Sequence, residues 1–280
     1  MIATLPFAAV MLSALLHATW NAIARSSPKP GDAMAAGVMA SGIYTLPLLL
    51  VVGMPDRAAW PWLFAAIAIN CVGIRAAMAA FNRMSFGLAY PIMRAGIPLM
   101  AVPIGIVLVR EQPTVLAIIG VAMISAALLT LAVIAHRQSK GDFGALPLAL
   151  FASLCGAGYV ACDAMGVRLA GSTLSYIAAV SVGNAIALPL LIKLEGRKPL
   201  ALFADNRKLG FGIAVISTTS FSLYVWVLSV SPVAVAAALR ETSVLFATAI
   251  AALVLKERIV PMHWAAAGLA FAGIVVLRAA

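Results

Sequence analysis

The chain has 280 residues, of which 64% are apolar and 10% are charged, and its formal net charge is +10. Soluble domains contain about 45–50% apolar and about 25% charged residues, so this composition excludes an ordinary soluble protein. Little sequence remains between the apolar stretches, which excludes a separate catalytic or nucleotide-binding domain.

Ten apolar stretches are long enough to cross a bilayer, which takes about 20 residues of helix. In chain order, the predicted spans are 4–25, 32–53, 60–82, 86–109, 114–135, 145–167, 173–193, 209–229, 232–255 and 260–278. Strands of a membrane barrel alternate apolar and polar residues, and these stretches do not. The sequence therefore predicts an all-α, polytopic membrane protein with ten transmembrane helices.

The second half of the chain repeats the first. The stretch from Arg94 to Glu111 aligns without a gap on the stretch from Arg240 to Glu257. Each half holds five predicted helices, and because five is odd, the second copy enters the membrane upside down. Inverted repeats are typical of secondary transporters, whose substrate site lies between the copies near mid-membrane. We therefore predict two inverted five-helix repeats, at residues 1–140 and 141–280.

Basic residues gather in alternate loops. Twelve of the 19 Lys and Arg residues lie in the loops after helices one, three, five, seven and nine, and the longest polar connection is 193–208. By the positive-inside rule these loops are cytoplasmic, so both termini are expected outside. This placement explains the net charge without a nucleic-acid partner. We predict a multi-pass protein of the bacterial inner (plasma) membrane.

Three arginines, Arg75, Arg94 and Arg240, lie inside predicted spans, where a charge costs at least about 2.5–3.5 kcal/mol. Arginine stays charged and can hold a carboxylate through two parallel hydrogen bonds. We therefore predict that the arginines bind an anionic group of the substrate, and that Arg94 binds a substrate carboxylate. The alternative is structural, with Arg240 paired to Asp163 or to Glu241.

Helix one carries His17, Trp20 and Asn21, whose spacing of three and four places them on one side. Helix six offers Tyr159 and Asp163 at the corresponding positions of the repeat. We predict that both faces line a shared cavity. His17 is expected either to couple transport to protons or to hydrogen-bond across helices, and Trp20 either to line the cavity or to lie in an interfacial aromatic belt.

Helix four carries Pro91, Pro98 and Pro103, whereas its repeat partner, helix nine, has only Pro232 at its start. Proline disrupts helix regularity, and such disruptions at membrane depth line cavities. We therefore expect a kinked helix four, which moves during transport, beside a straight helix nine.

Small residues recur in the last helix of each repeat. Gly120 and Ser125 in helix five match Gly268 and Gly273 in helix ten. Because small residues let helix backbones approach closely, we expect these two helices to form the packing interface between the halves.

The loop after the fourth helix of each repeat carries an acidic residue, Glu111 or Glu257. Together with ten helices in two inverted repeats, this pattern resembles the drug/metabolite transporter superfamily, EamA-type branch. The first half departs from it with Arg110-Glu111-Gln112, where the family prefers Glu-Arg. The resemblance implies a central cavity walled by helices one, three, four, six, eight and nine, which moves metabolites without ATP.

Within that superfamily, the aromatics, arginines and His17 are most similar to aromatic amino-acid exporters of the YddG type. We therefore predict a secondary exporter of small metabolites by alternating access, amino acids above all, with a preference for aromatic and apolar ones. One alternative is a lipid or organophosphate transporter, because arginines would also suit the phosphate group of such a substrate. The other is an intramembrane enzyme, for which the sequence offers no HExxH motif.

We expect no catalytic residue, metal or cofactor. The expected partners are a small-molecule substrate and membrane lipid, and the expected state is a monomer. The predicted substrate-binding residues are Arg94, His17, Trp20, Asn21, Tyr90, Arg75, Phe81, Tyr159, Asp163, Trp226 and Arg240, with Glu111 and Glu257 as structural residues of the repeat motif.

Overall fold

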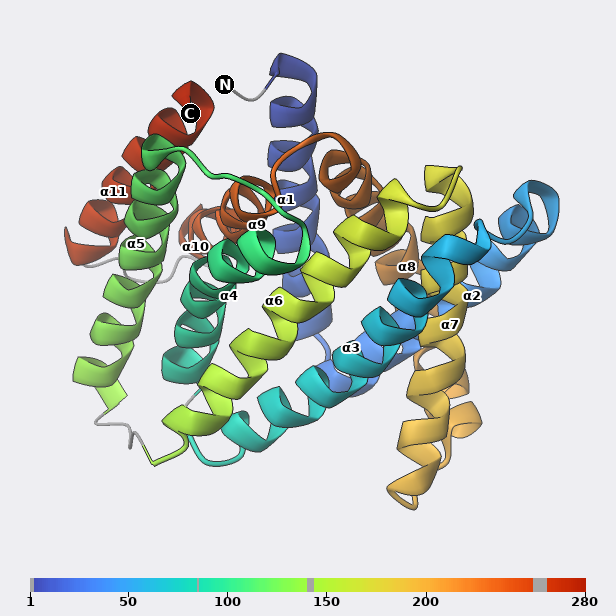
Figure 1. Ribbon diagram of the computed structural model, residues 1–280. Helices are drawn as coiled ribbons and strands as arrows, with labels where there is room; N and C mark the ends of the chain where they lie inside the picture. Colours follow the sequence, from blue (N-terminus) through green and yellow to red (C-terminus); the bar gives the residue numbers. More distant parts are fainter. Residues whose placement is uncertain (1–2, 85, 140–143, 254–260) are drawn as a thin grey trace.

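The computed structural model describes residues 3–84, 86–139, 144–253 and 261–280, which form helices and no strand (Figure 1). This confirms the predicted all-α fold. The helices are α1 (Thr4–Arg25), α2 (Pro30–Val52), a 3-10 turn (Arg57–Ala59), α3 (Trp60–Phe81), α4 (Phe86–Leu108), α5 (Val115–Ser139), α6 (Leu146–Arg168), α7 (Thr173–Leu194), α8 (Pro199–Val230), α9 (Val233–Glu241), α10 (Ser243–Leu253) and α11 (Pro261–Ala279).

Among the described residues, nine helices are long and apolar enough to cross a membrane. The ninth predicted span is filled by α9 and α10 together. Large apolar side chains cover the outside of the bundle, such as Val51 at 85% exposure, and these surfaces suit contact with lipid chains. The protein is a polytopic helical membrane protein.

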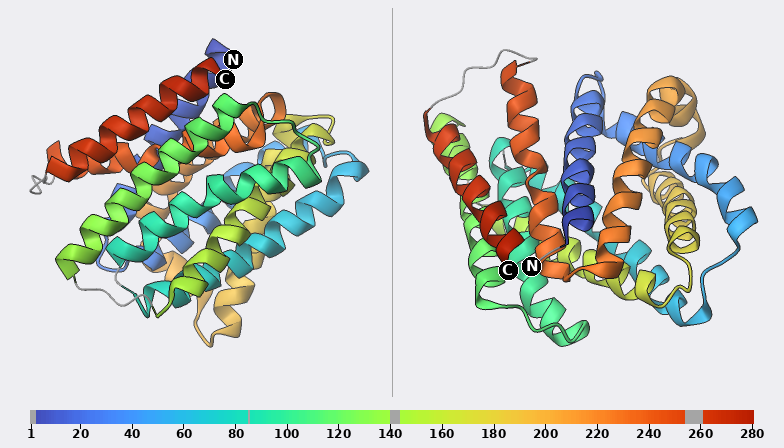
Figure 2. Two further views of the ribbon diagram at one scale, coloured as in Figure 1. Left: turned by 60° about the vertical axis from the view of Figure 1, so that its left-hand side comes forward. Right: turned by 90° about the horizontal axis from the view of Figure 1, so that it is seen from above.

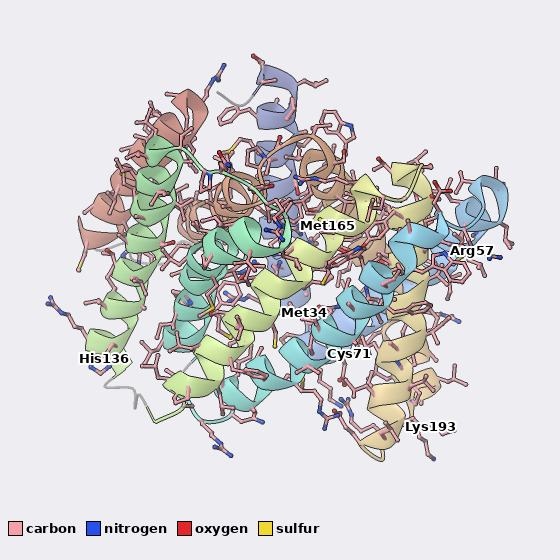
Figure 3. All side chains as sticks on the ribbon, viewed as in Figure 1. Met34, Arg57, Cys71, His136, Met165 and Lys193 are labelled. Carbon is pink, nitrogen blue, oxygen red and sulfur yellow. The ribbon has the colours of Figure 1, made fainter. Side chains whose placement is uncertain are left out.

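The two termini lie side by side at one end of the bundle (Figures 1 and 2). We call this end the terminal face, where α1, α3, α5, α7 and α9 begin. The opposite end is the basic face, where Lys193 and His136 extend from the bundle (Figure 3). Most of the arginines and lysines in the predicted loops lie at this basic face.

The helices pack in matching pairs. α3 packs on α6 as α1 packs on α8, while α2 contacts α7 and α5 contacts α11. The α1–α8 contact is held by two buried serines, since the hydroxyl of Ser13 donates to the Ser220 carbonyl and the Ser220 hydroxyl donates to the Ser13 carbonyl, each at 2.7 Å. Such reciprocal bonds keep both hydroxyls satisfied where water is absent.

Two predictions about the helices were wrong, one about the start of helix eight and one about the shape of helix nine. The segment 193–208 is not a long connection, because α8 already begins at Pro199 and runs for 32 residues. Proline is well suited to the first turn of a helix, where its missing N–H is not needed. The second error concerns helix nine, which is not straight but breaks at Thr242 between α9 and α10.

The contact between α5 and α11 depends on two glycines. A Cβ on Gly120 would lie 3.2 Å from the Gly273 carbonyl, and a Cβ on Gly273 would lie 2.8 Å from Ile124. The predicted close packing of these helices therefore occurs, but a Cβ on Gly268 would meet nothing within 4 Å. Gly268 is thus not part of the contact.

Replacing Gly273 with alanine is expected to lower the free energy of unfolding by about 1–3 kcal/mol, because the added methyl overpacks the α5–α11 contact. Gly268→Ala on the same helix is the matched control and should leave stability unchanged or slightly raised. Thermal denaturation of both variants in detergent measures the difference. Equal melting temperatures would contradict the proposed role of Gly273.

Candidate functional site

A cavity of about 300 Å³ lies at mid-depth between the helices. Contrary to the expected wall, α2 and α7 line it and α4 does not. The lining residues are His17 and Trp20 of α1, Val38 and Ser41 of α2, Asn70, Cys71 and Ile74 of α3, Tyr159 of α6, Ser181, Asn184 and Leu188 of α7, Ser217, Thr218 and Phe221 of α8, and Arg240 of α9.

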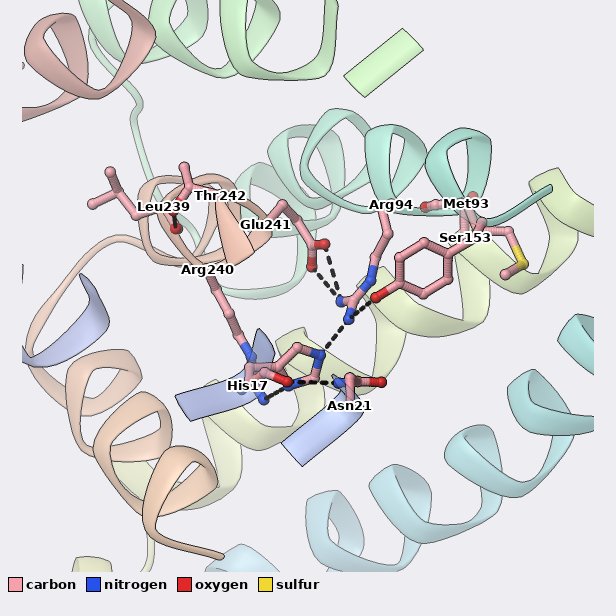
Figure 4. Close-up of polar contacts among 10 residues, drawn as sticks. His17, Asn21, Met93, Arg94, Ser153, Leu239, Arg240, Glu241 and Thr242 are labelled. Atoms are coloured by element: carbon pink, nitrogen blue, oxygen red, sulfur yellow. Dashed lines mark hydrogen bonds and ion pairs between the residues drawn. The ribbon is translucent and has the colours of Figure 1, made fainter. Parts of the chain in front are cut away.

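Among the described residues, Arg240 is the arginine that lines the cavity. Its guanidinium carbon lies 4.1 Å from the centre of the Tyr224 ring. Its Nη2 lies 3.3 Å from Nδ1 of His17 (Figure 4). Among the described residues, no carboxylate forms a salt bridge with Arg240. The expected alternative pairings with Asp163 and Glu241 are therefore not formed, and Arg240 retains hydrogen-bond donors for an anion.

Arg94, in contrast, is paired with a buried carboxylate. Its Nη1 lies 3.0 Å from both carboxylate oxygens of Glu241, and its Nη2 donates to the Tyr90 hydroxyl at 2.9 Å and contacts Nε2 of His17 (Figure 4). The side chains of Arg94 and Glu241 are only 14% and 4% exposed. Removing two such charges from water is costly, and their mutual attraction and hydrogen bonds offset that cost.

His17 lies between the two arginines, with one ring nitrogen facing each. A guanidinium has only donors, whereas a neutral imidazole has one acceptor nitrogen. His17 can therefore accept from one arginine at a time. The closer contact is with Arg94, so the interaction of Arg240 with His17 is the weaker one. This geometry is that of a bridge between helices, and proton coupling through His17 stays a prediction.

The break after α9 has a local cause. The backbone N–H and the hydroxyl of Thr242 both bond to the Leu239 carbonyl, at 3.3 and 2.5 Å, in place of the regular helical pattern. Threonine hydroxyls compete with helical hydrogen bonds in this way. By contrast, α4 stays helical through its three prolines. The break places Arg240 and Glu241 at a helix end at membrane depth, the position at which broken helices bind substrates in transporters.

Residues 143–279 match the EamA-like transporter family. The chain carries an EamA-like transporter domain. This match indicates a membrane transporter of the drug/metabolite transporter superfamily. A solved crystal structure aligns over 98% of this transporter and 95% of its own chain, with a TM-score of 0.72 and 16% sequence identity. At that identity the likeness shows the fold alone. No curated protein matches the sequence.

The two predicted residues of helix six lie in different environments. Tyr159 lines the cavity, as does Trp20 of helix one. Asp163 is fully buried behind the wall, where its Oδ1 accepts a hydrogen bond of 3.0 Å from the Tyr176 hydroxyl. Its other oxygen has no hydrogen-bond partner among the described residues.

Five further predicted residues lie outside the cavity wall. Arg75 forms a 3.3 Å salt bridge with Glu195 after α7, and its side chain is 52% exposed. The Asn21 amide donates to the carbonyl of His17 on its own helix at 2.7 Å. Phe81 packs in a separate apolar cluster at the end of α3, and Trp226 packs against the main core. Tyr90 accepts a hydrogen bond from Arg94.

The sequence prediction missed the amide and hydroxyl groups of the wall. Asn70 donates to Asn184 at 2.9 Å between α3 and α7, and Thr218 donates to Ser41 at 3.1 Å between α8 and α2. The predicted repeat relates α3 to α8 and α2 to α7, so the two bonds occupy corresponding places. Amides at mid-span are costly in lipid, and that cost was the signal that could have identified them.

The two predicted structural residues of the repeat motif are Glu111 and Glu257. Glu257 lies outside the described residues. Glu111 accepts hydrogen bonds from the backbone N–H of Val233, at 3.0 and 2.9 Å, and from Arg168 at 3.1 Å. It is thus a contact between the α4–α5 loop and the start of α9.

Proposed function

We propose that this transporter exports amino acids, with a preference for aromatic and apolar ones, by alternating access to the central cavity. The observation that carries the proposal is Arg240, a guanidinium that faces the cavity without a carboxylate partner among the described residues. An arginine in this position favours a substrate carboxylate, which it can bind through two hydrogen bonds.

The remaining wall fits the rest of an amino acid. Trp20, Tyr159 and Phe221 offer flat apolar faces, and aromatic contacts add about 0.5–1.5 kcal/mol beyond simple burial. A volume of about 300 Å³ is at the lower limit for ligand pockets, which span about 300–1,000 Å³. A single small metabolite fits that space better than a phospholipid or a sugar nucleotide.

We further propose that residues 1–140 and 141–280 are the two inverted repeats that rock about this cavity. Matching contacts support this, since α1–α8 corresponds to α3–α6 and Ser41–Thr218 corresponds to Asn184–Asn70. A two-fold relation of this kind allows the site to be exposed first to one face and then to the other.

The test is counterflow in proteoliposomes with each of the twenty amino acids. Phe, Trp, Met and Leu should exchange faster than Asp or Lys, because the wall has apolar faces and one fixed charge. Selectivity should be broad, since one methylene changes affinity only about 10–200-fold. Liposomes without protein are the control. Rapid exchange of aspartate without exchange of aromatic amino acids would overturn the proposed preference.

The second candidate, a lipid or organophosphate transporter, rests on the same arginine, because phosphate also suits a guanidinium. Sugar phosphates and inorganic phosphate belong in the counterflow panel, and fluorescent phospholipids in a parallel scramblase assay. Transport of any of these in preference to amino acids would favour this second function.

Both termini are expected outside the cytoplasm, because the basic face carries most of the loop arginines and lysines. A pair of reporters fused after Ala280, one active only in the periplasm and one only in the cytoplasm, measures the orientation. Activity of the cytoplasmic reporter alone would reverse the proposed orientation without affecting the fold.

A further inference from the structure

Glu111 and Arg168 connect four segments at the terminal face. Arg168, the last residue of α6, donates from Nε to the Leu228 carbonyl at 3.1 Å and from Nη2 to the Ser231 carbonyl at 2.8 Å. Its Nη2 also donates to Glu111 at 3.1 Å. The end of α6, the end of α8 and the α4–α5 loop are thus joined through two side chains.

Glu111 in turn holds the start of α9. No side chain of α9 or its flanking residue caps this helix, and the first N–H, that of Val233, is instead bound by both oxygens of Glu111. A carboxylate at a helix N-terminus also complements the helix dipole. The loop conformation supports the contact. Arg110 adopts φ +61°, and a Cβ on Gly105 would lie 3.2 Å from the Glu111 carboxylate.

α9 separates two cavities. Its first turn, at Ala234 and Val235, lines a cavity of about 280 Å³ at the terminal face, which Glu111 and Ser231 also line. Its last turn, at Arg240, lines the central cavity. The residues between these turns, 236 to 239, are buried. The helix is therefore a partition between the terminal face and the central cavity.

We propose that Glu111 and Arg168 form a gate that keeps the central cavity closed toward the terminal face, with α9 as the moving partition. The proposal rests on the alternating-access function proposed above. α9 has nine residues and ends at the break at Thr242, so it can move as a short rigid unit. Substrate at Arg240 and Glu111 at Val233 act on opposite ends of this helix, so movement at one end is transmitted to the other.

Cys71, labelled in Figure 3, provides a direct test, because it lines the central cavity whereas Cys155 and Cys162 are buried. The protein is reconstituted in vesicles, and a membrane-impermeant maleimide is applied to one face at a time. In the unmodified protein, Cys71 should react faster from the basic face. In Glu111→Gln and in Arg168→Gln, reaction from the terminal face should be at least about tenfold faster than in the unmodified protein.

Two controls define the readout. Cys71→Ser should abolish labelling, which shows that the other cysteines do not react. Arg197→Gln breaks an ion pair with Asp32 at the basic face and should not increase labelling from the terminal face. Size-exclusion profiles identify variants that misfold. If a variant misfolds, the unmodified protein is labelled instead, with and without a saturating transported amino acid. The amino acid should change the labelling rate from the terminal face.

If Glu111→Gln and Arg168→Gln fold and the rate of Cys71 labelling from the terminal face is unchanged, the gate is overturned. If those variants misfold, the gate is overturned when substrate does not change that labelling rate in the unmodified protein. Labelling of the variants needs no transported substrate, so its outcome is separate from the amino-acid assignment. Faster labelling without amino-acid counterflow would support the gate and reject the substrate. Counterflow with unchanged labelling would do the reverse.

Discussion

Arg240→Gln is expected to lower amino-acid uptake at low substrate concentration by at least about 100-fold. A hydrogen bond to a charged group contributes about 1.5–3 kcal/mol, and a carboxylate held by a guanidinium makes two of them. Losing about 3 kcal/mol corresponds to more than a hundredfold in affinity. The measurement is initial-rate counterflow of phenylalanine in proteoliposomes that contain equal amounts of folded protein.

Arg240→Lys should restore part of this transport, since the ammonium keeps the charge but lacks the planar pair of donors. Arg75→Gln is the matched control. It removes another arginine from a predicted span, but one that pairs with Glu195 outside the cavity wall, and it should keep near-normal transport. Normal uptake in Arg240→Gln would reject Arg240 as the carboxylate receptor.

Arg94→Ala is expected to lower the free energy of unfolding by about 3–5 kcal/mol, because it leaves the Glu241 carboxylate buried without its partner. This expectation differs from the sequence-based prediction that Arg94 binds a substrate carboxylate. Thermal denaturation in detergent measures the loss.

Arg94→Gln/Glu241→Gln removes both charges and should recover most of that stability. A double-mutant cycle with the two single Gln variants isolates the coupling between the residues. A coupling energy near zero, or an Arg94→Ala variant as stable as the unmodified protein, would show that the ion pair contributes little. In that case the role of Arg94 in substrate binding would again be open to test by counterflow.

The sequence by itself determined the membrane architecture. The apolar stretches have the length of a bilayer crossing, and a helix satisfies its own backbone hydrogen bonds in lipid. For this reason α1 begins and ends where the prediction placed it, at Thr4 and Arg25, and most other spans agree within a few residues. The cost of a charge in lipid also singled out the span arginines, and Arg240 does line the cavity.

Only the tertiary structure decided which arginine is free. Glu241 follows Arg240 in the sequence, yet it binds Arg94, 147 residues away. Adjacent residues of a helix point in different directions, so Glu241 faces α4 while Arg240 faces the cavity. The break at Thr242 and the cap that Glu111 gives to α9 likewise depend on contacts between distant segments. Hydrophobic length is a property of each segment alone, whereas the pairing of buried charges depends on which helices meet.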